Sequence, residues 1–307
     1  MTPVLRLQGW GFCALALAAV VAGLAGARLA ILHELLAAGV LISLLGMPHG
    51  AFDVVFARKL FGVADVRGWA VFGLFYIGLS AGVVGFWFVA PTPFLCVFLV
   101  FSAVHFAGDP PAGVSMIARG LYGGAVIVLP ALWHGAELQL LLGWVAGPAS
   151  AASIAPVLSQ MAAPWLAATA LACALLARAS RTAAWELAAL AALSVAAPPM
   201  VAFTVYFCAM HSPRHILRTC ASLPGGEVRK ALALALWPTL AVLAALAGIG
   251  WLTRGMSMAP WVMQLVFVGL AALTLPHMLL LERARRVVAL ALPRQSRSTP
   301  GPRARAS

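Results

Sequence analysis

Histidines are the residues of this sequence whose type and placement could do chemistry. Five of the seven lie inside long apolar stretches: His49, His105, His211, His215 and His277. An imidazole in an apolar helix is costly unless it has a partner, so an ionisable residue there is a candidate functional group. A single histidine of this kind would more often be a packing residue, hydrogen-bonded to a neighbouring helix. Because metal sites in helical bundles are built from side chains of several helices, five histidines predict a metal site.

The strongest local pattern is YFCAMHSPRH, which places His211 and His215 four residues apart. On a helix this spacing puts both rings on one face, where they can clamp one metal ion. Pro213 lies between them and could start a new helical turn or kink the old one. Imidazole ligands without cysteine suit iron, zinc or copper.

Two acidic residues follow histidines at helical spacing. Asp53 comes four residues after His49 in GMPHGAFD, and Asp109 comes four residues after His105 in HFAGDPP. A buried carboxylate on the same helical face could accept the second imidazole N–H and orient the ring. Two alternatives stay open. Asp53 could pair with one of the two basic residues that follow it, and Asp109 could mark the end of a helix before two prolines.

The elements that position these residues are predicted to be membrane-spanning helices. Of 307 residues, 63% are hydrophobic and 9% are charged, against about 25% charged in soluble domains. The apolar runs approach the roughly 20 residues that cross a bilayer, whereas a soluble α/β protein would show runs of about 4–8 residues.

The predicted fold class is an all-α, polytopic transmembrane helical bundle of about 8–10 spans in a single domain. Residues 1–282 are expected to form the catalytic helical domain, and residues 283–307 a basic, disordered tail. The expected spans are 9–27, 30–57, 68–90, 92–107, 116–133, 156–177, 183–197, 199–217, 230–252 and 259–281.

The basic residues predict how these spans are oriented. With the N-terminus in the cytoplasm and ten alternating spans, every Lys and Arg except Arg28 and Arg254 falls on the inner side, as the positive-inside rule requires. We therefore expect a multi-pass protein of the inner (plasma) membrane with both termini cytoplasmic. The net charge of +12 is explained by membrane anchoring, and nucleic acid is not expected as a partner. In this topology the five histidines share one depth, whereas His33 and His134 lie at the outer surface.

Four motifs carry a resemblance to a known family. GMPHGAFD, HFAGD, YFCAMHSPRH and LPHM, in this order and spacing, resemble the Brp/Blh family of bacterial and archaeal β-carotene 15,15′-dioxygenases over residues 46–281. Members of that family are multispanning membrane proteins that make retinal, often for microbial rhodopsins. The resemblance implies that Fe(2+), held by histidines, and O₂ split the central double bond of β-carotene into two retinal molecules.

The resemblance also implies roles for individual residues. Carried over by motif, the expected metal ligands are His49, His105, His211 and His215. His277 is expected to be an alternative ligand or a neighbour of the ligands, and Asp53 and Asp109 are expected to orient ligand rings.

The implied partners are β-carotene or a related carotenoid, O₂ and membrane lipid, with a functional link to a microbial rhodopsin. A carotenoid site would have apolar and aromatic walls. The candidates near the ligands are Phe101, Phe106, Phe203 and Phe207, although aromatic residues in spans also serve in packing or face lipid. Tyr206 could donate a hydrogen bond to bound oxygen.

Two other functions are weighed against this one. A transporter or proton-relay protein would also use intramembrane histidines, but it would show more buried acids and an inverted repeat. The sequence offers only Asp53 and Asp109 as buried acids and contains no repeat. A non-catalytic carotenoid-binding protein would need no metal, which leaves the shared depth of the histidines unexplained.

Overall fold

The regular elements of the protein are helices, as the apolar runs predict. The computed structural model describes residues 2–253, 255 and 257–291, and within this part no strand occurs. The α-helices are α1 (Pro3–Leu24), α2 (Ile31–Leu41), α3 (Asp53–Phe61), α4 (Val66–Val89), α5 (Pro91–Phe106), α6 (Met116–Val128), α7 (Gly135–Ala146), α8 (Pro148–Ala179), α9 (Arg181–Ala196), α10 (Pro199–Tyr206), α11 (Ser212–Ala221), α12 (Val228–Leu252) and α13 (Met258–Ala291).

Short irregular helices connect some of these elements. They are the π-helices η1 (Ile42–Gly46) and η4 (Phe207–His211) and the 3₁₀-helices η2 (Met47–Phe52), η3 (Leu129–Leu132) and η5 (Gly225–Glu227). The segments η1, η2 and η4 flank or contain histidines of the predicted site.

The structure is a polytopic helical bundle, as predicted, but it supports fewer spans. Among the described residues, six helical segments are long and apolar enough to cross a membrane. A seventh results if α6–η3 and α7, bent by 114°, form one broken span. The expected count of eight to ten is not reached because some expected spans are short or divided. The expected span 92–107, for example, is α5, which has only 16 residues.

The end of α13 bears on the expected domain boundary. This helix continues to Ala291, so the boundary expected after residue 282 falls within a helix. Residues 292–307, which make up most of the expected basic tail, lie outside the described residues.

Local sequence signals set several helix ends. The Asp65 carboxylate caps α4 by accepting the Gly68 N–H at 2.9 Å, as short polar side chains do at helix starts. Helix α3 ends at Gly62, whose φ of +64° favours glycine. Helix α6 packs closely on α5 at Gly123, where an added Cβ would collide with the Ala103 carbonyl oxygen.

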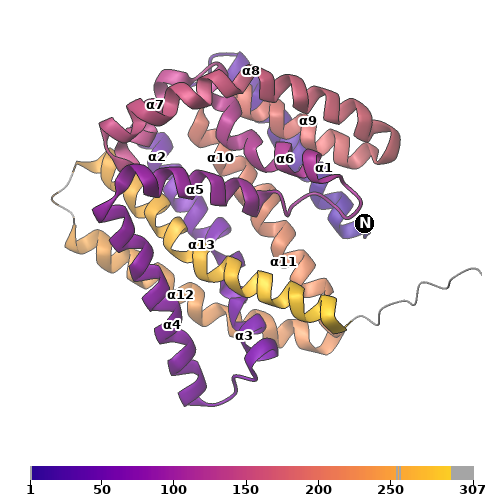
Figure 1. Cartoon of the computed structure of the whole chain (residues 1–307), viewed down its shortest axis with the longest axis vertical. Coiled ribbons are helices and arrows are strands. Elements are labelled where there is room, and N and C mark those ends of the chain that lie inside the picture. The colour runs from indigo at the N-terminus through magenta and orange to yellow at the C-terminus, as the bar shows by residue number, and fades with distance from the viewer. Residues whose placement is uncertain (1, 254, 256, 292–307) are drawn as a thin grey trace, which may run out of the picture.

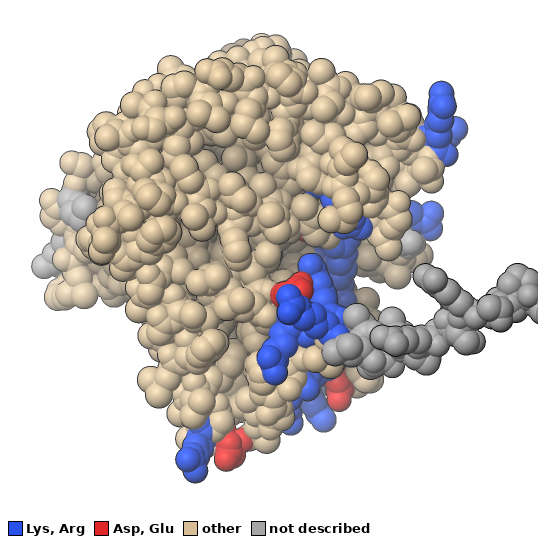
Figure 2. Space-filling model, viewed as in Figure 1, with Lys and Arg blue, Asp and Glu red and all other residues tan. Residues whose placement is uncertain are grey.

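Helix α13 crosses the middle of the molecule and contacts α2, α3, α4 and α7 (Figure 1). Helices α1, α8 and α9 pack together and form one end, where α9 lies against both α1 and α8. On the face seen in Figure 2, basic side chains of the described residues lie at the lower end and along the right edge. The predicted histidine site lies where α13 meets α5, η2, η4 and α11.

Candidate metal centre

The structure brings the five histidines of the apolar stretches into one cluster. The ring centroids lie 4.5 Å apart for His105 and His211, 4.9 Å for His49 and His211, and 5.1 Å for His215 and His277. The His277 ring also lies 5.4 Å from that of His49. These side chains come from η2, α5, η4, α11 and α13, so residues far apart in the sequence share one buried site.

The other two histidines lie elsewhere, as predicted. His33 is exposed on α2. His134 precedes α7, and its Nδ1 lies 3.1 Å from Nη2 of Arg28. Neither ring contacts the cluster in the described part of the chain, so both residues are natural controls for it.

His211 is oriented by a buried carboxylate and a tyrosine. Its Nδ1 lies 3.1 and 3.0 Å from the two carboxylate oxygens of Asp109, and the Tyr206 hydroxyl donates to Asp109 Oδ2 at 2.6 Å. A carboxylate can only accept, so Nδ1 of His211 carries the hydrogen and Nε2 keeps its lone pair. This Nε2 is buried and has no hydrogen-bond partner among the described residues.

His277 is held by a second arrangement of the same kind. Its Nδ1 donates to Asp53 Oδ1 at 2.7 Å, and the Tyr76 hydroxyl donates to Asp53 Oδ2 at 3.0 Å. Its Nε2 is likewise buried and unpartnered in the described structure. A carboxylate that fixes the ring and tautomer of a histidine is the usual support of a metal ligand.

The remaining three histidines complete a donor set that fits a metal ion. His49 Nδ1 donates to the Gly46 carbonyl at 2.6 Å, which leaves the lone pair on Nε2. The Nε2 atom of His215 is buried without a partner among the described residues. Ligand atoms of His49, His105 and His277 all lie within 4.8 Å of one another. Neutral imidazoles brought together from several helices suit a divalent transition metal.

The predicted partners of the two acids are wrong. Asp53 was expected to orient His49, but residues 47–52 form a 3₁₀-helix, so the side chains do not keep the α-helical spacing of four residues. Asp109 was expected to orient His105, but α5 ends at Phe106, so Asp109 is free to reach His211. The Nδ1 atom of His105 lies instead 2.8 Å from Sδ of Met278.

Three of the four predicted phenylalanines join the rings around the site. The Phe106 ring lies 4.9 Å from that of His211, and the Phe207 ring lies 5.4 Å from those of His49 and His211. Phe203 stacks on Phe207 at 5.3 Å. Phe101 is only partly buried, and no ring contact joins it to this group within the described residues.

Tyr206 is fully buried beside the site, but its hydroxyl already has a partner. A phenol has one hydrogen to donate, and Asp109 accepts it. The geometry therefore supports a role for Tyr206 in holding Asp109 rather than the expected hydrogen bond to bound oxygen.

Two arginines hold the segment that carries Asp109. This role was not predicted from the sequence. Arg218 donates to the carbonyl oxygens of Gly108 at 2.8 Å and of Asp109 at 2.6 Å. Arg214 forms two hydrogen bonds of 2.7 Å with Glu186, and both side chains are 1% exposed. The signal was present in the sequence, because charged residues within an apolar stretch require partners.

The comparisons with known proteins agree with this geometry. The sequence model of the β-carotene 15,15′-dioxygenase family matches residues 40–283. The chain is similar to a probable β-carotene 15,15′-dioxygenase Blh of Halobacterium salinarum, with 29% identity over 93% of each chain. It is also similar to a β-carotene 15,15′-dioxygenase of an uncultured marine bacterium, 66A03, with 28% identity over 79% of this chain and 90% of the relative. No solved structure matches the chain. The matched region contains the whole histidine cluster, and the chain belongs to the β-carotene 15,15′-dioxygenase family.

Proposed function

We propose that this protein cleaves the central double bond of β-carotene, or of a closely related carotenoid, with O₂ to give two molecules of retinal at an iron ion. The observation that carries the proposal is the histidine cluster in a member of this family. Buried Nε2 atoms of His211, His215 and His277 have no partner among the described residues, and an unsatisfied buried polar atom needs an explanation. A bound metal ion explains all three.

The proposed ligands are His49, His105, His211 and His215, with His277 as a further ligand of equal standing. His277 is supported by the same arrangement as His211, because each Nδ1 donates to a carboxylate that also accepts from a tyrosine. A histidine that only packs beside the metal ligands would not require an oriented ring with an unpartnered Nε2. Iron, when bound, supplies the activation of O₂.

The protein's own residues prepare the site in three ways. Asp53 and Asp109 keep the Nδ1 hydrogens of His277 and His211 in place, so that both Nε2 atoms stay free to bind. Phe106 and Phe207 are buried against the histidine rings, where they exclude water and keep the surroundings of the site apolar. The carotenoid dissolves in the bilayer, so the buried site needs no aqueous path for its substrate.

The distribution of basic residues supports an orientation in the membrane. We propose that the protein lies in the plasma membrane with both termini in the cytoplasm, because the basic side chains seen in Figure 2 lie at its lower end and right edge and cytoplasmic segments collect them. Membrane lipid then surrounds the apolar helices. Retinal would be released within the bilayer, where a retinal-binding membrane protein such as a microbial rhodopsin could take it up.

The test is product analysis in cells that make β-carotene and express this chain. We expect retinal to appear as β-carotene falls, and we expect His211→Ala to abolish retinal formation and lower the iron content of the purified protein. The matched controls are His33→Ala and His134→Ala, which lie outside the cluster and should leave both quantities unchanged. Intact β-carotene in cells whose membranes contain the iron-loaded wild-type protein would refute the proposed reaction and favour a carotenoid-binding or transport role.

A further inference from the structure

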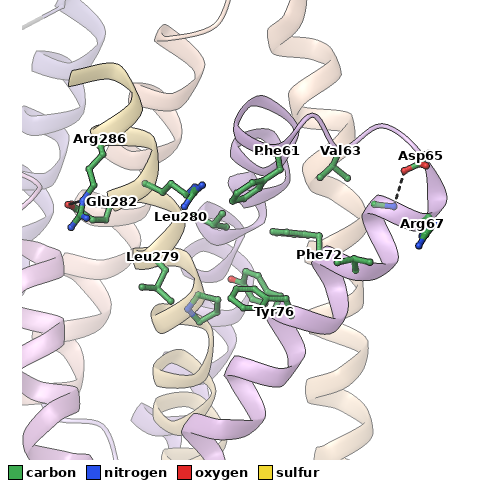
Figure 3. A pocket seen from close by; sticks show the side chains of 15 residues that line it. Phe61, Val63, Asp65, Arg67, Phe72, Tyr76, Leu279, Leu280, Glu282 and Arg286 are labelled. Carbon is green, nitrogen blue, oxygen red and sulfur yellow. Dashed lines mark hydrogen bonds and ion pairs between the residues drawn. The ribbon is translucent and has the colours of Figure 1, made fainter. Parts of the chain in front are cut away.

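A large, partly open cavity lies between α4 and α13 and is bounded at one end by α3 (Figure 3). Its volume is about 970 Å³, near the upper end of the range for small-molecule sites, about 300–1,000 Å³. The walls include Phe61, Phe72, Phe75, Tyr76 and Leu279. Aromatic side chains are thus concentrated around this cavity, although they make up 9% of the chain.

Charged residues lie at one end of the cavity, and several of them already form hydrogen bonds or ion pairs within the protein. The Asp65 carboxylate caps α4 through the Gly68 N–H, and Glu282 pairs with Arg286 at 2.8 Å (Figure 3). The remaining lining is mostly apolar. An extended apolar ligand fits this part of the lining better than a polar one, because burying a polar group without partners is unfavourable.

The cavity borders the histidine site through two of its lining residues, although none of the five histidines is among its described lining residues. Tyr76 contributes its ring to the wall and donates its hydroxyl to Asp53, which holds His277. Pro276 also lines the cavity and directly precedes His277 on α13. A ligand in the cavity therefore contacts the residues that position one proposed metal ligand.

The length of the cavity suits part of a carotenoid. Its lining extends along α13 from Pro276 to Arg286, which at 1.5 Å per residue is about 15 Å. This is comparable with one half of an extended carotenoid, from the central double bond to the terminal ring.

We propose that this cavity holds one ring-bearing half of the carotenoid and so sets which double bond lies at the histidines. The inference rests on the proposed function, because the ligand is the substrate of that reaction. Aromatic walls contact the polyene and the ring. The exposed charged side chains at the far end, those of Asp65, Arg67 and Arg286 among them, disfavour deeper entry of the apolar substrate. Cleavage at the centre then follows from the distance between that end and the histidine cluster.

Two variants that narrow the cavity, and one that does not, test this inference. Val71→Trp narrows the cavity from α4, and Leu279→Trp narrows it from α13. The control is Leu74→Trp, because Leu74 lies on α4, is 72% exposed and does not line the cavity. The substrates are β-carotene and a shortened apocarotenal that carries a single ring and can place its truncated end in the cavity.

We expect Val71→Trp and Leu279→Trp to lower kcat/KM for β-carotene by at least about tenfold relative to Leu74→Trp, as misfit groups in apolar pockets do. The loss for the shortened substrate should be smaller. The two variants should also retain less β-carotene than the control when the protein is purified in metal-depleted form.

Two results would overturn the assignment of the cavity. One is cleavage of both substrates by the narrowed variants at the rate of Leu74→Trp. The other is an equal loss for both substrates with unchanged carotenoid retention. Failure of the proposed function would look different. The wild-type protein would then form no retinal from either substrate, regardless of how much β-carotene the purified variants retain.

Discussion

Replacement of Asp53 tests the support of His277 most directly. Asp53 is 2% exposed, and its oxygens accept from His277 Nδ1 at 2.7 Å and from the Tyr76 hydroxyl at 3.0 Å. Asp53→Ala leaves the Nδ1 hydrogen buried without an acceptor and frees the ring to rotate. Loss of such a partner typically weakens metal binding by about 10–100-fold, which corresponds to about 1.4–2.8 kcal/mol.

A graded series separates orientation from charge. Asp53→Asn keeps an acceptor for Nδ1 but removes the negative charge, so we expect the smaller end of this range. Tyr76→Phe removes only the hydroxyl that steadies the carboxylate and should have the weakest effect. The measurement is titration of the metal-depleted protein in detergent with Fe(2+), together with retinal formation at saturating iron.

The control is Asp65→Ala, which removes the cap of α4 and no hydrogen bond of a histidine in the described structure. It should lower stability by about 1 kcal/mol and leave the Kd for iron unchanged. If Asp53→Ala bound iron as tightly as the wild type, the idea that Asp53 prepares His277 as a ligand would be refuted.

Three further predictions concern other parts of the site and its scaffold. His277→Ala should lower both the iron content and retinal formation while the protein stays folded, and wild-type iron content in this variant would remove His277 from the ligand set. Gly123→Ala should lower the Tm, because the added Cβ would collide with the backbone of α5 and overpacking costs about 1–3 kcal/mol. Gly120→Ala on the same helix should not lower the Tm, because its Cβ would lie in open space. Arg214→Met should destabilise the protein by about 3–5 kcal/mol because it leaves Glu186 buried and unpaired. Thermal unfolding should show much of this loss restored in the double variant with Glu186→Leu.

The composition of the site could be predicted from the sequence because each histidine stands out in an apolar stretch. An imidazole there requires a partner, and the positive-inside pattern assigned five of them to one depth. The same reasoning separated His33 and His134, which the structure places away from the cluster. These inferences depend on the chemistry of single residues in lipid and not on tertiary contacts.

The partners within the site could not be predicted in the same way. The bond between Asp53 and His277 joins residues 224 positions apart, and that between Asp109 and His211 joins residues 102 apart. Sequence spacing draws attention to neighbours at four residues, which assumes an unbroken α-helix. Tyr76, on α4, has no histidine near it in the sequence, so nothing marked it as part of the site.

Local spacing failed for Asp109 because α5 ends at Phe106, and for Asp53 because the helix before it is irregular. Irregular helix geometry also has a structural consequence of its own. A π-helical or 3₁₀ turn redirects side chains and leaves backbone carbonyl groups without their usual partners. In a membrane those carbonyls must be satisfied within the protein. The Ser212 hydroxyl donates to the Leu45 carbonyl of η1 at 2.7 Å, and Gln8 Nε2 of α1 donates to the Ala209 carbonyl of η4 at 2.7 Å. Both bonds tie an irregular turn to another helix beside a histidine of the cluster, so the distorted segments are held in one arrangement. The chain can therefore aim rings such as that of His211 in directions that a regular α-helix would not allow.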